Sequence, residues 1–295
     1  MLVALLIPLG LATLFYAVTL VRAALAQRSW PTLESIILGA VTNFFDTLGI
    51  GCFAPTMAWF RFRRLVPDRL IPCTLIVGHT LPTMTESIIF LVLLGVLVDP
   101  LLLVGCVVAF LVGGFLGVPL ATRARAWIIQ AVVGCGLVLA AILYALTNLH
   151  LMPGGGAAAG LSPPLLTVAV VASFVFGVLL NFGIGNYAPT LALLSLMGMD
   201  PRLCFPIMAA SAGLSMAGTS VRYIGFGEVN LRIVLGMALG GIPAVLAAAF
   251  IVKNMPIELL RWMVIVIVLY AALVILRAAF AGRGDEVKAL AAAAS

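Results

Sequence analysis

The stretch Gly49-Ile-Gly-Cys-Phe-Ala-Pro-Thr56 returns later in the chain as Gly183-Ile-Gly-Asn-Tyr-Ala-Pro-Thr190. Six of the eight positions are identical, and the two copies lie 134 residues apart. The same offset pairs Pro72 with Pro206. Glycine and proline at matched places are not what a general bias towards apolar residues produces, so we interpret the two copies as parts of an internal repeat.

The composition around this repeat places the chain in a lipid bilayer. Of the 295 residues, 64% are hydrophobic and 9% are charged, and the mean hydropathy is +1.27. A water-soluble protein usually carries about 25% charged residues. The net charge of +6 would favour a nucleic-acid partner in a soluble protein, but here it indicates membrane topology, and we expect no nucleic-acid binding.

Several apolar segments are long enough to cross a hydrocarbon core, which takes about 20 helical residues. They are nine in number: 2–25, 33–60, 70–97, 101–119, 126–147, 164–196, 203–224, 232–252 and 258–280. Segments 33–60 and 164–196 are longer than a bilayer needs and contain the two motif copies, so we predict helices that are broken in the middle. No positively charged residues precede segment 2–25, and its apolar run is longer than the signal-peptide core of about 7 to 15 residues. We therefore expect it to be a transmembrane span that is not cleaved off.

The positive residues indicate how these segments lie in the membrane. If all nine cross, nine Lys and Arg residues fall on one side and seven on the other. If the two broken segments are re-entrant, thirteen share one side and only Arg202, Lys253 and Arg261 lie opposite. The second arrangement follows the positive-inside rule, and it predicts an N-terminus outside and a C-terminus in the cytoplasm.

The resulting fold class is an all-α integral membrane protein with about seven transmembrane helices and two re-entrant broken-helix segments. We expect a first helix with its cytoplasmic loop, a first repeat, an extracytoplasmic linker, a second repeat and a polar tail, at 1–32, 33–148, 149–163, 164–281 and 282–295. Each repeat holds a re-entrant segment and three spans, so the two halves have opposite orientation. Inverted repeats with broken helices are the architecture of secondary transporters, whose substrate site lies near the midplane.

The breaks are suited to an anion. A half-helix that begins near Pro55 or Pro189 would present backbone N–H groups and partial positive charge, and two such helix starts would favour a small anionic substrate. The alternative is that the glycines serve helix packing. The predicted substrate-binding residues are Asn43, Thr47, Gly49, Gly51, Cys52, Phe53, Thr56, Thr80, Thr83, Asn181, Gly183, Gly185, Asn186, Tyr187, Thr190, Ser211 and Ser215. The hydroxyls among them suit an oxyanion but also bridge helices in ordinary bundles.

Three ionisable residues fall at membrane depth, where insertion of a charge costs about 2.5 to 3.5 kcal/mol, and they are candidates for proton coupling. Asp46 lies in the first break, with helix capping as the alternative. His79 and Glu86 lie seven residues apart on one helix. His79 could instead be a neutral ring bonded to a carbonyl, and Glu86 could be solvated near the headgroups. The 134-residue offset places Gly213 and Ser220 at the equivalents of His79 and Glu86, which predicts asymmetric coupling.

The duplicated break, with proline about 16 residues after each copy, resembles the TauE/SafE family, also called the toluene-sulfonate uptake permeases. This resemblance covers about residues 35 to 280. It implies a bacterial inner-membrane carrier of sulfite or organosulfur anions such as sulfonates and sulfoacetate. The family's commoner break reads G-I-G-G-G, and this sequence has Cys52-Phe53 and Asn186-Tyr187 where the last two glycines would stand. These larger side chains bear on the identity of the substrate.

Other classes of function find less support. The sequence has no H-E-x-x-H, no G-x-S-x-G and no phosphate-binding loop, so we expect neither an enzyme nor a nucleotide-driven pump. Five cysteines without a C-x-x-C pair and two histidines indicate no metal site, and no cofactor is expected. A passive anion channel or a permease for a non-sulfur carboxylate remains as the alternative. The sequence is compatible with a monomer and with a homo-oligomer.

Overall fold

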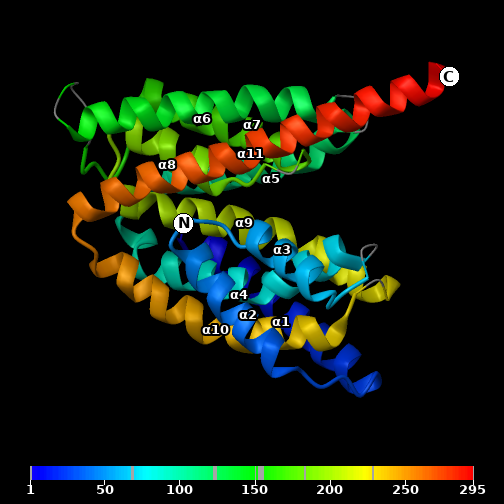
Figure 1. The fold of residues 1–295 in the computed structure, drawn as a ribbon. Helices are drawn as coiled ribbons and strands as arrows, with labels where there is room; N and C mark the ends of the chain where they lie inside the picture. Colours follow the sequence, from blue (N-terminus) through cyan, green and yellow to red (C-terminus); the bar gives the residue numbers. More distant parts are fainter. Residues whose placement is uncertain are drawn as a thin grey trace. The chain divides into compact units, whose positions relative to one another are not determined.

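The computed structural model describes residues 2–67, 70–121, 125–149, 151, 156–182, 184–227 and 229–294. Their secondary structure is helical, with an isolated bridge between Ala158 and Met199. The α-helices, labelled in Figure 1, are α1 (Leu2–Ala26), α2 (Leu33–Thr47), α3 (Phe53–Arg63), α4 (Ile71–Leu93), α5 (Pro100–Ala121), α6 (Ala126–Asn148), α7 (Pro163–Leu180), α8 (Tyr187–Leu196), α9 (Pro201–Phe226), α10 (Leu231–Asn254) and α11 (Ile257–Ala294). A 3₁₀ turn, η2 (Gly95–Leu97), follows α4.

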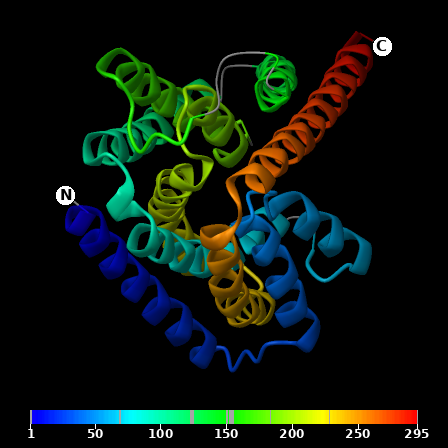
Figure 2. The same ribbon diagram turned by 90° about the vertical axis from the view of Figure 1, so that its left-hand side faces the viewer.

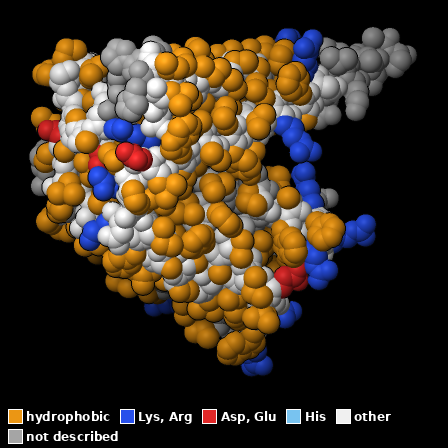
Figure 3. All heavy atoms as spheres, turned by 60° about the vertical axis from the view of Figure 1, so that its left-hand side comes forward, with side chains coloured by type: hydrophobic (Ala, Val, Ile, Leu, Met, Phe, Trp, Pro, Cys, Tyr) orange, Lys and Arg blue, Asp and Glu red, His pale blue; other side chains and the backbone are white. Residues whose placement is uncertain are grey.

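Eight of the described helices are long and apolar enough to cross a membrane. Their exposed side chains include many large hydrophobic residues, and the face drawn in Figure 3 is mostly hydrophobic, with the charged side chains gathered in a few groups. The chain is therefore an all-α, multi-pass membrane protein. The count is one higher than the seven spans predicted, because α7 has 18 residues and a mean hydropathy of 2.2, whereas α2, its counterpart in the first half, has 15 residues.

The chain forms two compact units, and each is interleaved in sequence with the other. Unit 1 comprises Met1–Val107 and Phe205–Met255, and unit 2 comprises Val108–Cys204 and Pro256–Ser295. Unit 1 thus contains α1 to α4, most of α9 and all of α10, and unit 2 contains α6, α7, α8 and α11. The two predicted repeats do not coincide with these packing units, because each unit holds helices of both halves.

Glycines of α2 and α10 bring these two helices of unit 1 into close contact. A Cβ atom on Gly39 of α2 would collide with the backbone of Met237, and one on Gly240 of α10 would collide with the backbone of Ile36. Figure 2 shows α10, in gold, alongside α2, in blue. Small residues that let two backbones approach are the usual device for packing helices in a bilayer, where helix association gains little from the hydrophobic effect.

A second close contact of this kind joins α5 and α7 in unit 2. A Cβ atom on Gly113 of α5 would collide with the carbonyl of Phe174, and one on Gly177 of α7 would collide with the carbonyl of Phe110. Ser35, Gly39 and Asn43 of α2 also have the same spacing as Ser173, Gly177 and Asn181 at α7 and its C-cap, at an offset of 138 residues, four more than that of the motif copies. Helix packing is thus a role of these four glycines, which lie outside the two motif copies.

Each broken segment folds back on itself as a helical hairpin. At the start of α2, Oε1 of Glu34 accepts hydrogen bonds from Nε1 of Trp59 at 3.1 Å and Nε of Arg63 at 2.8 Å, both from α3. The second hairpin, α7–α8, is joined outside its helices: the Ala158 N–H donates to the Gly198 carbonyl at 3.2 Å, and the Asp200 N–H donates to the Ala158 carbonyl at 3.0 Å. In both hairpins the chain therefore returns to where it started.

Candidate functional site

The first break lies between α2 and α3, at the motif copy that the sequence singled out. Gly49 and Gly51 have φ angles of +95° and +91°, which residues with a Cβ atom rarely adopt. These two glycines allow the chain to turn within five residues, Leu48 to Cys52, so that α3 begins again at Phe53. Pro55 falls in the first turn of α3, as predicted, where a missing N–H costs no helical hydrogen bond.

A buried chain of hydrogen bonds connects the three helices around this break. Nδ1 of His79, on α4, lies 2.8 Å from Oδ1 of Asn43 on α2. Its Nε2 lies 2.9 Å from Oγ1 of Thr56 on α3. All three side chains are at most 1% exposed, and the ring of Phe53 packs against the imidazole with 5.8 Å between centroids. His79 therefore connects the two sides of the break.

Two buried carboxyl groups in the described part of unit 1, those of Asp46 and Glu86, contact residues next to this chain. Asp46 contacts both the thiol and the backbone N–H of Cys52, the residue that precedes α3, so its carboxyl occupies the helix start in the manner of a cap. Glu86 lies with its Oε2 3.4 Å from Oγ1 of Thr47, and Thr47 follows Asn43 by one turn of α2. Glu86 is fully buried, which contradicts the alternative of a carboxyl solvated at the headgroups.

The charge of this cluster is acidic. Among the residues whose burial the structure describes, no Lys or Arg side chain is buried. No group of three or more His, Cys, Asp or Glu residues in the described chain is arranged to hold a metal ion. Asp46 and Glu86 are thus buried within unit 1 among Asn, Thr, Cys and His side chains.

The hydroxyl-bearing residues of α4 and α9 contact each other and the backbone. Oγ1 of Thr80 lies 2.6 Å from Oγ of Ser220, and it donates to the Ile76 carbonyl at 2.8 Å. Ser211 and Ser215 donate to carbonyls of their own helix, at 2.7 and 2.9 Å. Thr83 is buried too, and its carbonyl accepts from Ser87 at 2.7 Å. The Thr80 hydroxyl thus bridges α4 and α9 through Ser220, whereas those of Ser211 and Ser215 bond within α9.

The second break differs from the first in chemistry. α7 ends at Leu180 and α8 begins at Tyr187, and Gly183 lies outside the described residues. Nδ2 of Asn181 donates to the Gly114 carbonyl of α5 at 3.0 Å. Gln130 donates to the Phe182 carbonyl at 2.9 Å, which satisfies one backbone group freed by the break. Gly185 is exposed.

No ionisable carboxyl accompanies this second break. Residues 181–190 contain no Asp or Glu, and the side chain of Asn186 does not cap α8. Asn186 and Thr190 are buried, and Tyr187 is half-buried. The second motif copy therefore has no neighbouring carboxyl in sequence like the one that Asp46 supplies at the start of α3, and the two breaks are chemically unequal.

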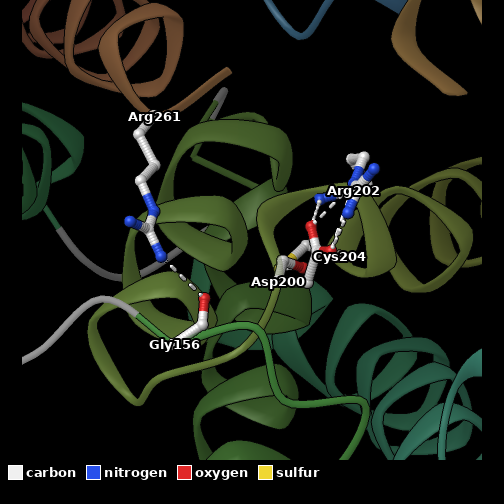
Figure 4. Close-up of polar contacts among 5 residues, drawn as sticks. All are labelled: Gly156, Asp200, Arg202, Cys204 and Arg261. Carbon is white, nitrogen blue, oxygen red and sulfur yellow. Dashed lines mark hydrogen bonds and ion pairs between the residues drawn. The ribbon is translucent and has the colours of Figure 1, made fainter. Parts of the chain in front are cut away.

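A third polar cluster in unit 2 was not predicted from the sequence. Asp200 lies directly before α9, pairs with Arg202 at 2.6 Å and accepts from the Arg202 N–H at 2.9 Å. Nearby, Arg261 of α11 donates to the Gly156 carbonyl at 3.2 Å (Figure 4). The Asp-Pro pair before a helix is a recognisable capping signal. Arg261 had no local signal, because its partner lies 105 residues away.

The fold and these clusters define the class: a multi-pass helical membrane protein with two helix breaks, one of them surrounded by buried ionisable side chains. No protein-family model matches the sequence, and neither a curated protein nor a solved structure matches it. The resemblance to the TauE/SafE family therefore remains a prediction from the sequence motifs.

Proposed function

We propose that the protein is a secondary transporter that moves a small sulfur-containing oxyanion by alternating access about its two Gly-Ile-Gly breaks, coupled to protons. The proposed setting is a bacterial inner membrane, with the N-terminus outside and the C-terminus in the cytoplasm. The observation that carries the proposal is the burial of Asp46, His79 and Glu86 around the first break. A membrane protein retains ionisable groups at such depth when they bind ions or protons.

The hairpin geometry supports re-entrant segments. A segment that enters and leaves on one side must bring its two ends together, and both hairpins do so, through Glu34 with Arg63 and through Ala158 with Gly198. Thiol labelling of single cysteines tests this topology. Trp30→Cys and Arg64→Cys should react from the cytoplasmic side, and Ala159→Cys and Lys253→Cys from the outer side. Labelling of Trp30→Cys and Arg64→Cys from opposite sides would contradict a re-entrant first segment.

The matched helix contacts support two inverted halves. α2 packs on α10 in unit 1, and α7 packs on α5 in unit 2. Under the proposed repeat, α2 corresponds to α7 and α10 to α5, so the same pair of helices forms the glycine contact twice. Each contact joins one helix of the first half with one of the second.

The unequal breaks support a division of roles. An oxyanion at the first break would meet Asp46 and Glu86, and like charges at this depth repel strongly unless protons neutralise the carboxyls. The start of α8 has no such carboxyl, and a helix start favours anions through its N–H groups and dipole. Protons at the first break and the oxyanion at the second would make the transported charges compensate each other.

The test is electrical measurement of flux into proteoliposomes on a solid-supported membrane. The panel is sulfite, thiosulfate, sulfate, sulfoacetate, an aryl sulfonate, a simple carboxylate and chloride, each at two pH values. Saturating currents for a sulfur oxyanion, with counterflow and a dependence on the pH gradient, are the expected result. Flux that neither saturates nor shows counterflow would indicate a channel, and a response to the carboxylate alone would indicate a different substrate class.

A further inference from the structure

We propose that Asn43 and Thr56 make His79 a directional proton switch. Asn43 holds the neutral ring in the form protonated at Nδ1, and a proton that binds at Nε2 turns the Thr56 hydroxyl from His79 to the carbonyl of Cys52. The switch would link proton binding at His79 to the first break through the Thr56 hydroxyl. Only its role in coupling protons to transport rests on the proposed function.

The amide of Asn43 can have only one orientation. Its Nδ2 lies 2.7 Å from the Gly39 carbonyl, and its Oδ1 lies 2.8 Å from Nδ1 of His79. Turning the amide around would place Oδ1 against the Gly39 carbonyl, where two acceptors face each other without a proton. Gly241 of α10 lies directly behind the amide, because a Cβ atom there would come within 2.7 Å of Nδ2.

The fixed amide determines the tautomer of His79. An amide oxygen can only accept, so Nδ1 of His79 must carry a proton. In the neutral ring Nε2 then has a lone pair, and the Thr56 hydroxyl at 2.9 Å must be the donor. A neutral imidazole protonated at Nε2 would leave Nδ1 and Oδ1 of Asn43 as two facing acceptors. The bond partners thus leave Nε2 as the nitrogen at which a proton can bind.

Thr56 uses its hydroxyl differently from many other threonines of this protein. Seven of them donate to the carbonyl four residues earlier: Thr13, Thr19, Thr42, Thr47, Thr80, Thr85 and Thr167. For Thr56 that carbonyl belongs to Cys52, which already accepts the Thr56 N–H at 3.1 Å. The Cys52 carbonyl is therefore the acceptor that a helical threonine ordinarily uses, while the Thr56 hydroxyl is directed at His79 instead.

Protonation reverses the direction of the bond between His79 and Thr56. With a proton on Nε2, both ring nitrogens are donors, and the Thr56 oxygen must accept. The hydroxyl keeps its own proton, which turns to the Cys52 carbonyl. The covalent O–H bond of Thr56 stays intact, and the added proton stays on Nε2 of His79. The new hydrogen bond is therefore made to Cys52, the last residue of the break, which also contacts Asp46.

The titratable side chains of the elements around His79 are mostly acidic or neutral. α2 contributes Asp46, the break contributes the Cys52 thiol, α4 itself contributes Glu86, and α1 contributes the buried Tyr16, whose hydroxyl donates to the Val77 carbonyl at 2.6 Å. The Arg and Lys residues of α3 and α10 lie near the helix ends: Arg61, Arg63, Arg232 and Lys253. A proton on His79 therefore adds a positive charge to the buried cluster that also contains Asp46 and Glu86.

The first experiment determines the tautomer. The chain has two histidines, so protein with His150→Gln and ¹⁵N-labelled histidine in nanodiscs gives the ring signals of His79 alone. We expect the neutral ring to be protonated at Nδ1, and Asn43→Leu to lose that signal in favour of the form protonated at Nε2. Asn181→Leu is the matched control and should leave the signals unchanged. A neutral wild-type ring protonated at Nε2 would overturn the proposal.

The second experiment follows the Thr56 hydroxyl. Labelling with carbonyl-¹³C cysteine and ¹⁵N phenylalanine selects the two Cys-Phe pairs of the sequence, Cys52-Phe53 and Cys204-Phe205. As His79 is titrated by acid, the Cys52 carbonyl signal should shift because it gains a hydrogen bond, while the Cys204 signal stays. Thr56→Val should abolish the shift, Thr56→Ser should keep it, and Thr190→Val at the second break should have no effect.

Two results of this experiment would contradict the proposal. One is a Cys52 signal that stays in place while His79 titrates, and the other is a ring that remains neutral over the whole pH range in which the protein is folded. Both experiments are made without substrate, so they are independent of the proposed function. If they succeed and no anion produces a current, the switch stands and the transport proposal fails.

Discussion

Glu34 and Arg63 lie 29 residues apart in sequence, and Nε of Arg63 is 2.8 Å from Oε1 of Glu34. The pair joins the first turn of α2 to the last turn of α3 and so closes the open end of the first hairpin. A groove of about 480 Å³ lies beside it, lined by Leu33, Ile37, Val41 and Trp59 among others. The ion pair thus forms the charged end of a groove whose other lining side chains are largely apolar.

The contribution of this pair should depend on pH. The hydrogen bond from Arg63 holds the pKa of Glu34 below its ordinary value, so the pair stabilises the folded protein above the unfolded-state pKa, about 4.3. That stabilisation is lost as the pH falls through the lower folded-state pKa. Glu34→Gln should therefore lower Tm slightly at pH 7 and not at pH 3, measured in detergent. An equal decrease at both pH values would contradict this assignment.

Gly51 and Gly185 offer a matched test of backbone strain. A Cβ atom on either glycine would meet nothing within 4 Å, but only Gly51 has a positive φ. We expect Gly51→Ala to lower the free energy of unfolding by about 1–2 kcal/mol, the cost of a left-handed conformation for a residue with a Cβ atom. Gly185→Ala should have a much smaller effect. Similar losses in both, measured by chemical unfolding, would place the cost elsewhere.

Gly39→Ala tests the close contact of α2 with α10. The new methyl group would collide with the Met237 backbone, and such overpacking costs about 1–3 kcal/mol. Gly10→Ala, in α1, is the control, because a Cβ atom there meets nothing within 4 Å and alanine is the better helix former by about 0.5–1 kcal/mol. The two variants should thus change Tm in opposite directions, and a stabilising Gly39→Ala would refute the contact.

Asp46→Asn tests the proton coupling of the proposed transporter. With one proton bound per anion, the apparent affinity of the wild type should change by up to about tenfold per pH unit, because binding of the two is linked. The amide cannot take up the proton, so the variant should show a flattened pH profile of transport currents. Glu258→Gln, at the exposed start of α11, should behave like the wild type. An unchanged profile in Asp46→Asn would leave Asp46 with its capping role alone.

The helix breaks could be predicted from the sequence because their cause is local. A positive φ at Gly49 and Gly51 needs glycine, and a proline in the first turn marks where the next helix begins. The apolar segments were equally predictable, since each is set by its own composition. The number of helices long enough to cross was not predicted. The helix α7 runs 18 residues before its break, which is long enough to cross, whereas α2 runs 15.

The partners within the site could not be predicted, since they depend on the register between helices distant in sequence. His79 and Asn43 are 36 residues apart, and Thr80 and Ser220 are 140 apart. The sequence indicated that His79 lies at membrane depth, but not that an amide would fix its tautomer. It likewise suggested the Thr80 hydroxyl for an oxyanion, but not that this hydroxyl would lie 2.6 Å from Oγ of Ser220.

The interleaved units have a consequence for the order in which the protein is made. The ribosome completes α2 long before α10, so the face of α2 that carries Gly39 lacks its packing partner, the Met237 backbone, for most of synthesis. Unit 1 cannot finish folding until the helix before the last has been inserted. A gene divided in the linker between the halves should therefore yield two fragments that are degraded when expressed singly and recover together when expressed in one cell.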